Sequence, residues 1–139
     1  FKNIIATKEA SGSFDQFNQI MRDKPGDFLL ISGADPITLP MIALGASGII
    51  SVIANALPQQ FSDMVRKCLE GDFKGAIPAH LSLVEFTRLA FAEGNPAGVK
   101  AALKHLNICG DTVRLPLIKP SSTLEQNLIS EIEKLSQVA

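Results

Sequence analysis

Three short apolar runs recur in the first part of the chain, at residues 4–7, 28–31 and 49–53. Each run ends in small or polar residues, which is typical of a fully buried strand in a parallel sheet. Between the runs, apolar residues recur at the spacing of a helix. The helical positions are Phe14, Phe17, Ile20 and Met21, followed by Leu39, Ile42, Ala43 and Ala46. This alternation predicts right-handed parallel strand–helix units and an α/β fold.

Two motifs predict where the first helices begin. Ser13 and Gln16 have the spacing of a capping box, in which each side chain bonds the backbone amide of the other residue. Asp35 precedes Pro36, and a proline at the first helical position after an acidic N-cap is a common helix start. We therefore interpret Asp35 as an N-cap rather than as a catalytic acid.

From residue 57 onward the pattern is entirely helical. Apolar residues on two faces of residues 73–91 predict one long helix that is buried on two sides. Ser122 and Glu125 predict a capping box at the start of the last helix, and the prolines of residues 114–120 predict an extended connector. Each predicted helix has an apolar stripe, meaning apolar residues that recur on one face. From the first helix to the last, the stripes are Phe61, Met64, Val65, Cys68 and Leu69; the two faces Ile77, Leu81 and Val84 and Leu83, Phe86 and Leu89; Val99, Ala102, Leu103 and Leu106; and Leu124, Leu128, Ile132 and Leu135.

Composition and charge narrow the function classes. Hydrophobic residues make up 46% of the chain and the net charge is −1, which gives no electrostatic basis for binding nucleic acid or an anionic membrane. No apolar run reaches the roughly 18 residues that a membrane span requires. We therefore expect a soluble, cytoplasmic protein.

Residues that commonly hold metals are isolated in this sequence. Cys68 and Cys109 lack the spacing of metal ligands, and we expect both to be buried free thiols. His80 and His105 each lie in a helical stretch without a further Cys, Asp or Glu at ligand spacing. We therefore expect no metal site.

Lys8 carries the strongest chemical signal. It stands between the first apolar run and the turn Glu9-Ala10-Ser11-Gly12-Ser13, and active sites of α/β folds collect at the C-terminal ends of parallel strands. Free lysine is an ammonium at neutral pH, with a pKa of about 10.4, whereas desolvation favours the nucleophilic amine. We expect Lys8 to be half desolvated here; the alternative is an ordinary surface lysine. Adjacent strand residues point to opposite faces, so we expect Glu9 to lie outside the site of Lys8.

Several short motifs follow one another in order along nearly the whole chain. They are Lys8-Glu9-Ala10-Ser11-Gly12, Ser32-Gly33-Ala34-Asp35, Gly48-Ile49-Ile50-Ser51-Val52, Asn95-Pro96-Ala97-Gly98-Val99-Lys100 and Arg114-Leu115-Pro116-Leu117. Together they resemble the second half of the dihydrodipicolinate synthase family. Ala34 stands where many related sequences have aspartate, which affects no residue that we assign to chemistry.

The resemblance implies a pyruvate-dependent class I aldolase on a (β/α)8 barrel with a C-terminal helical extension. In that family a lysine at the position of Lys8 forms an imine with pyruvate, and the derived enamine attacks aspartate semialdehyde in lysine and diaminopimelate biosynthesis. By the same correspondence, Gly33 offers backbone next to pyruvate and the Ile50 backbone faces its carboxylate. The resemblance implies no cofactor and no metal, and it implies a homo-oligomer, a homotetramer in the parent enzyme.

The length of the chain predicts a fragment of such an enzyme. A (β/α)8 barrel needs about 250 residues, and this chain has 139. We expect residues 1–56 to form strands six to eight of the barrel, and residues 57–139 to form the final barrel helix and a C-terminal helical domain. The chain has no tyrosine, whereas the family relays protons through tyrosine hydroxyls, and its carboxylate clamp lies in the earlier half. The fragment alone is therefore expected to be inactive.

Two other functions stay open on the sequence. One is a sister aldolase, such as N-acetylneuraminate lyase or a keto-deoxy-sugar aldolase, because the missing half would mainly select the second substrate. The other is a non-catalytic folding or assembly module. We also expect the isolated chain to associate, because three strands cut from a barrel leave two open edges and an exposed apolar face.

Overall fold

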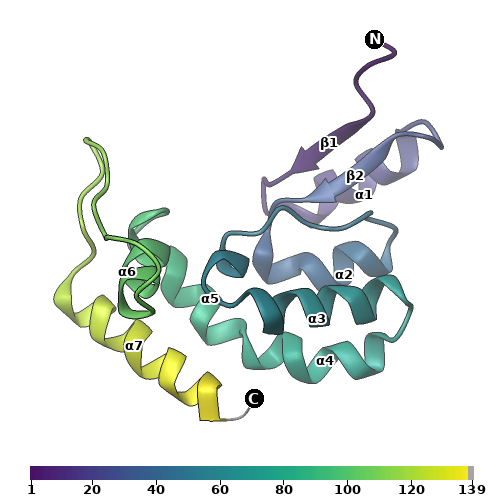
Figure 1. The fold of residues 1–139 in the computed structure, drawn as a ribbon. Coiled ribbons are helices and arrows are strands. Elements are labelled where there is room, and N and C mark those ends of the chain that lie inside the picture. Colours follow the sequence, from purple (N-terminus) through teal and green to yellow (C-terminus); the bar gives the residue numbers. More distant parts are fainter. Residues whose placement is uncertain (138–139) are drawn as a thin grey trace. The chain divides into compact units, whose positions relative to one another are not determined.

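The computed structural model describes residues 1–137 of the chain as two short strands and a series of helices (Figure 1). The elements are β1 (Ala6–Glu9), α1 (Phe14–Asp23), β2 (Leu29–Ser32), the 3-10 helix η1 (Asp35–Ile37), α2 (Thr38–Ala43), the 3-10 helix η2 (Ile53–Asn55), α3 (Pro58–Leu69), α4 (Phe73–Ser82), α5 (Val84–Phe91), α6 (Ala97–His105) and α7 (Ser122–Gln137). These elements confirm the predicted α/β class.

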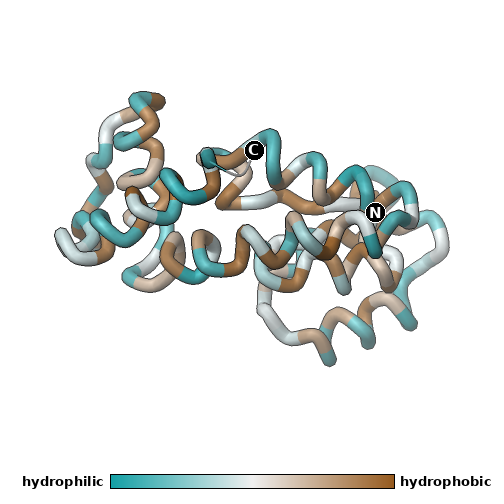
Figure 2. The backbone as a smooth tube through the Cα atoms, turned by 90° about the horizontal axis from the view of Figure 1, so that it is seen from below, coloured by the Kyte–Doolittle hydropathy of each residue, from teal (hydrophilic) through white to brown (hydrophobic). Residues whose placement is uncertain are grey.

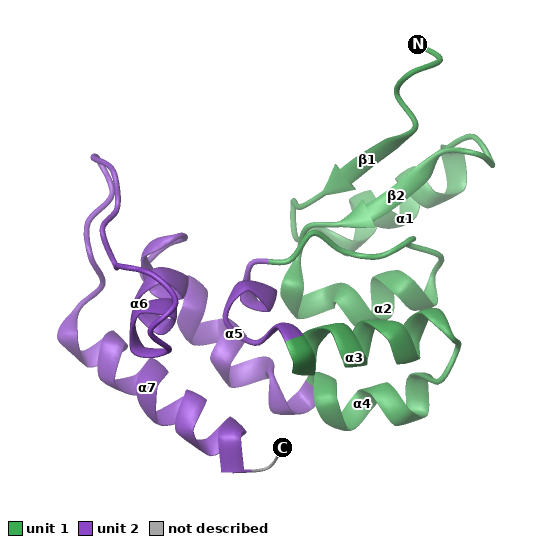
Figure 3. Ribbon diagram, viewed as in Figure 1, with its two compact units in different colours: residues 1–51, 59–80 green, residues 52–58, 81–139 purple. Residues whose placement is uncertain are grey.

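The chain divides into two compact units (Figure 3). Unit 1 consists of Phe1–Ser51 and Gln59–His80, and unit 2 consists of Val52–Pro58 and the described residues from Leu81 onward. The strands lie in unit 1, whereas α5, α6 and α7 lie in unit 2. The predicted division at residues 56 and 57 stays a prediction about the parent fold.

The sheet of unit 1 is parallel, as predicted. β1 pairs with β2 in the register that runs from Ala6 opposite Leu29 to Glu9 opposite Ser32. The prediction of a third strand at residues 49–53 was wrong in extent, because only a single parallel bridge joins Ser32 to Ile49. The chain then turns into η2, where the backbone amide and the side-chain amide of Asn55 both donate to the Val52 carbonyl, at 3.1 and 2.9 Å. Such local bonds compete with strand pairing.

The first strand is less buried than its sequence predicts. Ile4 and Ile5 precede β1 and remain 55% and 63% exposed. The Ile4 amide donates to the Phe1 carbonyl at 3.2 Å, so this part of the apolar run forms a turn. Only Leu30 and Ser32, on β2, are completely buried strand residues.

Helix α1 begins as predicted, with Ser13 at its N-cap and the Ser13 hydroxyl accepting from the Gln16 amide at 3.2 Å. The second half of the capping box is absent from this helix start, because the Gln16 side chain donates to Glu9 instead. Phe17 is fully buried on the inner face of α1. The helix α2 packs against β2 and adds Met41 to the core of unit 1.

The predicted stripe of α3 is confirmed at its centre. Phe61, Met64 and Cys68 are buried, whereas Leu69 at the end of the stripe is 52% exposed. Cys68 is a free thiol whose pKa is raised by burial. Cys109 is also a free thiol, but it is exposed, so the prediction that both thiols are buried was wrong for Cys109.

The single long helix predicted for residues 73–91 is two helices. α4 and α5 are separated by Leu83, whose turn conformation (φ −87°, ψ −7°) interrupts the helix. Pro78 within α4 lacks the N–H that a helix interior needs. Burial on two sides was also wrong, because only one of the two predicted apolar faces is covered. The covered residues are Leu83, Phe86 and Leu89, and the exposed residues are Ile77, Leu81 and Val84.

Unit 2 is a helical bundle in which α5, α6 and α7 contact one another. The predicted stripe of α7 is confirmed, with Leu124, Leu128, Ile132 and Leu135 all buried. In Figure 2 hydrophobic and hydrophilic positions alternate along the helical turns, as expected when one side of each helix is covered. No helix of residues 1–137 is long and apolar enough to cross a membrane.

The start of α7 differs from its prediction by one residue. The Ser121 hydroxyl, rather than that of Ser122, accepts from the Leu124 amide at 3.2 Å. Ser121 also donates to Glu93 through its amide and its hydroxyl, each at 2.6 Å. These bonds lower the pKa of the Glu93 carboxyl. The cap therefore also anchors the end of the connector that leads into α7.

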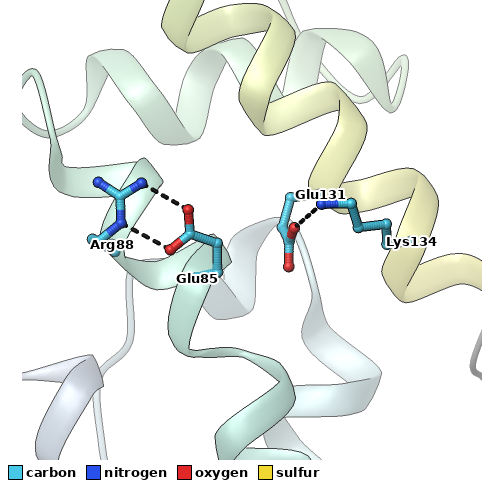
Figure 4. A network of polar contacts seen from close by, with 4 residues as sticks. All are labelled: Glu85, Arg88, Glu131 and Lys134. Carbon is cyan, nitrogen blue, oxygen red and sulfur yellow. Dashed lines mark hydrogen bonds and ion pairs between the residues drawn. The ribbon is translucent and has the colours of Figure 1, made fainter.

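Charged side chains of unit 2 form pairs along its helices and its connector. Figure 4 shows Glu85 with Arg88 on α5 and Glu131 with Lys134 on α7, at 2.7 and 3.1 Å. The extended connector of residues 114–120 holds no helix or strand, as predicted, and it is fixed by an ion pair with Asp111, which precedes it in the sequence. Its carboxylate pairs with Lys119 at 2.8 Å and with Lys104 at 2.9 Å, and these bonds lower its pKa to about 2.

Candidate active site

The three predicted site residues share one face of the sheet. Lys8 lies opposite Ile31 in the parallel register, so the two side chains point to the same face. Gly33 lies two residues after Ile31 and therefore on that face. Ile50 follows Ile49, which pairs with Ser32 on the opposite face, so Ile50 also belongs to the face of Lys8. All three stand at the C-terminal ends of their segments.

Gly33 makes room for the lysine. A Cβ atom at Gly33 would lie 2.5 Å from Lys8 Cε and 2.6 Å from Ala10 Cβ, so the Lys8 side chain passes directly over this glycine. The Gly33 amide donates to the Glu9 carbonyl at 2.7 Å and continues the pairing of the two strands. The structure thus brings Lys8 and Gly33 into contact, and a larger residue at position 33 would displace the lysine.

Ile50 contributes its backbone to the sheet. Its amide donates to the Ser32 carbonyl at 2.9 Å, so this N–H is already bonded within unit 1. Its side chain is 54% exposed beside the other strand ends. The assignment of the Ile50 backbone to a pyruvate carboxylate therefore stays a prediction.

The expected desolvation of Lys8 is not present in this structure. Lys8 is exposed, and Leu29 and Ile50 on the same face are 43% and 54% exposed. The physical reason is that this face of the sheet is open, whereas the opposite face is covered. The buried strand residues on that opposite face are Glu9, Leu30 and Ser32.

Glu9 lies on the opposite face from Lys8, as predicted, and is only 4% exposed. Its Oε1 atom accepts from the Ser11 amide at 2.9 Å and from Gln16 Nε2 at 3.1 Å. Its Oε2 atom is buried without a hydrogen-bond partner among the described residues. Glu9 therefore connects the end of β1 to the first turn of α1. The sequence predicted only the face on which Glu9 lies and not these hydrogen bonds.

Asp35 is not the N-cap of the 3-10 helix that begins with it. The N-cap of η1 is Ala34, and the Asp35 carboxylate accepts a hydrogen bond from the Ser51 hydroxyl. Asp35 is 2% exposed. The N-cap interpretation was thus wrong, and Ser51, a partner of this carboxylate, lies sixteen residues away, where no local pattern reveals it.

Other parts of the described chain offer no comparable cluster of reactive groups. Among residues 1–137 there is no group of three or more His, Cys, Asp or Glu side chains that could hold a metal ion. His80 stands alone, and burial lowers its pKa. A groove of about 730 Å3 in unit 1 contains none of the three candidate residues. Its lining residues are Phe1, Ile4, Gln19, Ile20, Asp23, Lys24, Pro25 and Phe28.

Comparison with known proteins decides the family. The model of the dihydrodipicolinate synthetase family matches residues 1–135, which is almost the entire chain. The chain belongs to this family. The match confirms the resemblance that the sequence motifs indicate, both those around Lys8, Gly33 and Ile50 and those at residues 95–100 and 114–117.

Individual members of the dihydrodipicolinate synthetase family are similar along the same region. The 4-hydroxy-tetrahydrodipicolinate synthase of Phocaeicola vulgatus is 47% identical over 135 residues, which cover 97% of this chain and 46% of that protein. The enzyme of the same name from Parabacteroides distasonis is 46% identical over 132 residues, or 95% of this chain and 44% of that protein. The chain spans about half the length of the curated relatives that it matches.

The fold also agrees with a solved member of the family. The crystal structure of dihydrodipicolinate synthase from Aquifex aeolicus superimposes with a TM-score of 0.92 at 38% identity, covering 97% of this chain and 46% of that one. The pairing of β1 and β2 therefore belongs to an arrangement that recurs in this family.

Proposed function

We propose that the chain carries the imine-forming part of a 4-hydroxy-tetrahydrodipicolinate synthase, a lyase that condenses pyruvate with aspartate semialdehyde in lysine and diaminopimelate biosynthesis. The observation that carries the proposal is the placement of Lys8, Gly33 and Ile50 on one face of the sheet, at the C-terminal ends of their segments. Active sites of α/β barrels lie at this end of the strands. Membership of the family and 47% identity to a named synthase support the same reaction.

The proposed chemistry begins at the Lys8 amine. Its lone pair attacks the ketone carbon of pyruvate, and the ketone oxygen leaves as water to give a cationic imine. The imine withdraws electrons, so the methyl carbon loses a proton and an enamine forms. The enamine carbon then bonds the aldehyde carbon of aspartate semialdehyde, whose oxygen takes up a proton as the imine re-forms. The amine of the product attacks the imine carbon, which closes the ring and releases Lys8 as the free amine. Gly33 lets the lysine side chain pass close to the backbone, where pyruvate would be held.

The architecture that we propose for the complete enzyme is a (β/α)8 barrel. In this proposal β1, β2 and the segment at Ile49 are strands six to eight, and residues 57–139 supply the last barrel helix and the helical extension. The open face around Lys8 and the 46% share of the related proteins both support it, because five further strands would cover that face. Desolvation of Lys8 would then come from those strands.

The rest of the catalytic apparatus belongs outside this chain in our proposal. The chain has no tyrosine to relay protons. A positioned acid–base partner typically increases a reaction rate 10²- to 10⁴-fold. Residues 1–139 alone should therefore not convert pyruvate and aspartate semialdehyde at a useful rate. We further propose that the complete enzyme is a cytoplasmic homo-oligomer, a location that suits the free thiols Cys68 and Cys109.

A chimera tests the proposal. Residues 1–139 replace the matching segment of the Phocaeicola vulgatus synthase, and turnover of pyruvate and aspartate semialdehyde is measured in a coupled assay. We expect turnover within about tenfold of the parent synthase, and a loss of at least about 10³-fold in Lys8→Arg, because guanidinium cannot act as the nucleophile. Lys24→Arg is the matched control and should retain turnover. An active Lys8→Arg chimera would contradict the proposal.

A further inference from the structure

Asp35 is a buried carboxylate close to the candidate site and has no role in the proposed chemistry. It follows Gly33 by two positions and is 2% exposed. Removing a carboxylate from water is costly unless the group is hydrogen-bonded or paired. A carboxylate buried at this position therefore needs hydrogen-bond donors from the surrounding structure.

One such bond joins two segments that are distant in the sequence. The Ser51 hydroxyl donates to Asp35 Oδ1. Ser51 directly follows Ile50, whereas Asp35 belongs to the loop that begins at Gly33. The hydrogen bond thus connects the two strand ends that carry the candidate pyruvate-binding positions, on the side where the backbone pairing stops.

The backbone attachment of the third segment is short. It forms one parallel bridge with β2 instead of a ladder of several residues. Three backbone hydrogen bonds hold it to β2, from Ser47 to the Leu30 carbonyl at 2.8 Å, from Ser32 to the Gly48 carbonyl at 2.8 Å and from Ile50 to the Ser32 carbonyl at 2.9 Å. A side-chain bond immediately after Ile50 therefore limits the freedom of the last paired residue.

The orientation of Asp35 is itself fixed. Pro36 restricts the backbone at the start of η1, because its ring locks φ. The hydroxyl of the fully buried Thr38 donates to the Asp35 carbonyl at 3.1 Å and to the Ala34 carbonyl at 3.2 Å. These contacts hold the turn in the conformation that directs the carboxylate to Ser51.

We infer that Asp35 is a positioning residue that acts through Ser51 to set the spacing between Gly33 and Ile50. The inference rests on the proposed function for what those two positions bind. Asp35 is buried, and we assign its effect to the bond with Ser51 rather than to contact with substrate. Its loss should weaken pyruvate binding while leaving the reactivity of Lys8, on another strand, nearly intact.

Amide hydrogen exchange in the 139-residue chain tests the bond without any catalytic assay. In Asp35→Ala and in Ser51→Ala we expect the Ile50 amide to exchange at least about tenfold faster, because a lost hydrogen bond to a buried group typically changes an equilibrium by such a factor. The Leu29 amide, which donates to the Ile5 carbonyl, is the internal reference and should change by less than about twofold. Unchanged exchange at Ile50 in both variants would overturn the inference.

Pyruvate trapping in the chimera measures the consequence for binding. The apparent half-saturating pyruvate concentration for borohydride trapping should rise about tenfold in Asp35→Ala, while the trapping rate at saturating pyruvate stays within about threefold. Asp35→Asn keeps an acceptor oxygen and Ser51→Thr keeps a hydroxyl, so both should restore most of the affinity. An equal fall in both kinetic parameters would indicate general disruption and would overturn the inference.

A matched control separates positioning from simple stability. Thr87→Val removes a buried hydroxyl on α5, which donates to the Leu83 carbonyl at 2.7 Å, and should leave pyruvate half-saturation unchanged. If the proposed function is wrong, the unmodified chimera traps no pyruvate on Lys8. The hydrogen-exchange experiment still decides in that case whether Asp35 positions Ile50.

Discussion

The last helix of unit 2 and the strand region of unit 1 leave their apolar residues in different environments. In unit 2 the apolar stripe of α7 is buried along its whole length, from Leu124 to Leu135. In unit 1 the two strands and the segments beside them leave Ile4, Leu29 and Ile50 exposed by 43–55%. A helix needs only one covered face, and a few neighbouring helices supply it. A parallel strand needs partners on both edges and layers on both faces, so its apolar residues reveal whether the sheet is complete.

Association should be the largest consequence of this difference. Contiguous exposed apolar patches of more than a few hundred Å2 are rare in monomers, and the open edge and face of unit 1 offer such a surface. We expect the isolated 139-residue chain to form a dimer or a larger assembly at micromolar concentration, as measured by light scattering. Ile4→Lys with Ile5→Lys should lower the association. A 14.9 kDa monomer with a dispersed spectrum would show that unit 1 needs no partner.

The buried apolar residues of unit 2 should contribute strongly to the stability of the chain. Phe86 is completely buried, so Phe86→Ala should lower the free energy of unfolding by about 3–5 kcal/mol. Phe1→Ala is the matched control at a residue that is fully exposed, and its effect should stay within about 0.5 kcal/mol. Urea denaturation followed by circular dichroism measures both. Similar losses of unfolding free energy in the two variants would contradict the importance that we give to the buried position of Phe86.

The cap of α7 offers a smaller and sharper test. Ser121→Ala removes the hydroxyl that accepts from the Leu124 amide and donates to Glu93, and it should cost about 1–2 kcal/mol. Ser122→Ala, at the residue that the capping-box pattern selected, should change stability by less than about 0.5 kcal/mol. A larger loss of stability in Ser122→Ala than in Ser121→Ala would show that Ser122 is the capping residue, as the sequence pattern predicted.

Acid should act on unit 2 through Asp111. Its pKa falls from 3.8 to about 2 in the folded chain, because Lys119 and Lys104 bond its ionised form. A lowered pKa means that the ionised carboxylate stabilises the folded state above about pH 4, and that this contribution is lost as the pH falls toward 2. Melting temperatures between pH 5 and pH 2 should therefore fall less steeply in Asp111→Asn. Asp27→Asn, the same change of charge at an exposed turn residue, should keep the slope of the unmodified chain.

Local patterns predicted the parts of the structure that depend on neighbouring residues. The α7 stripe and the Ser13 cap of α1 follow from spacings within four residues, and both are confirmed. The predicted third strand, the cap at Asp35 and the burial of Lys8 all failed. Each of these depends on a partner far away in the sequence, such as Ser51 for Asp35, or on a layer over the open face of the sheet.

The candidate site shows the same division between local and distant information. The position of Lys8 at the end of a strand could be read from the change from apolar to polar residues. The contact between Lys8 and Gly33 could not, because it needs the parallel register of β1 and β2. The role of Glu9 in tying β1 to α1 was likewise hidden, since alternation along the strand gave only the side to which it points.

The location of the pyruvate adduct tests the central claim most directly. The chimera is incubated with pyruvate and sodium borohydride, digested and analysed by mass spectrometry. The reduced imine should add a three-carbon acid to the peptide that contains Lys8, in proportion to the pyruvate concentration, and the adduct should vanish in Lys8→Arg. An adduct on Lys2 or Lys24 in place of Lys8 would contradict the account.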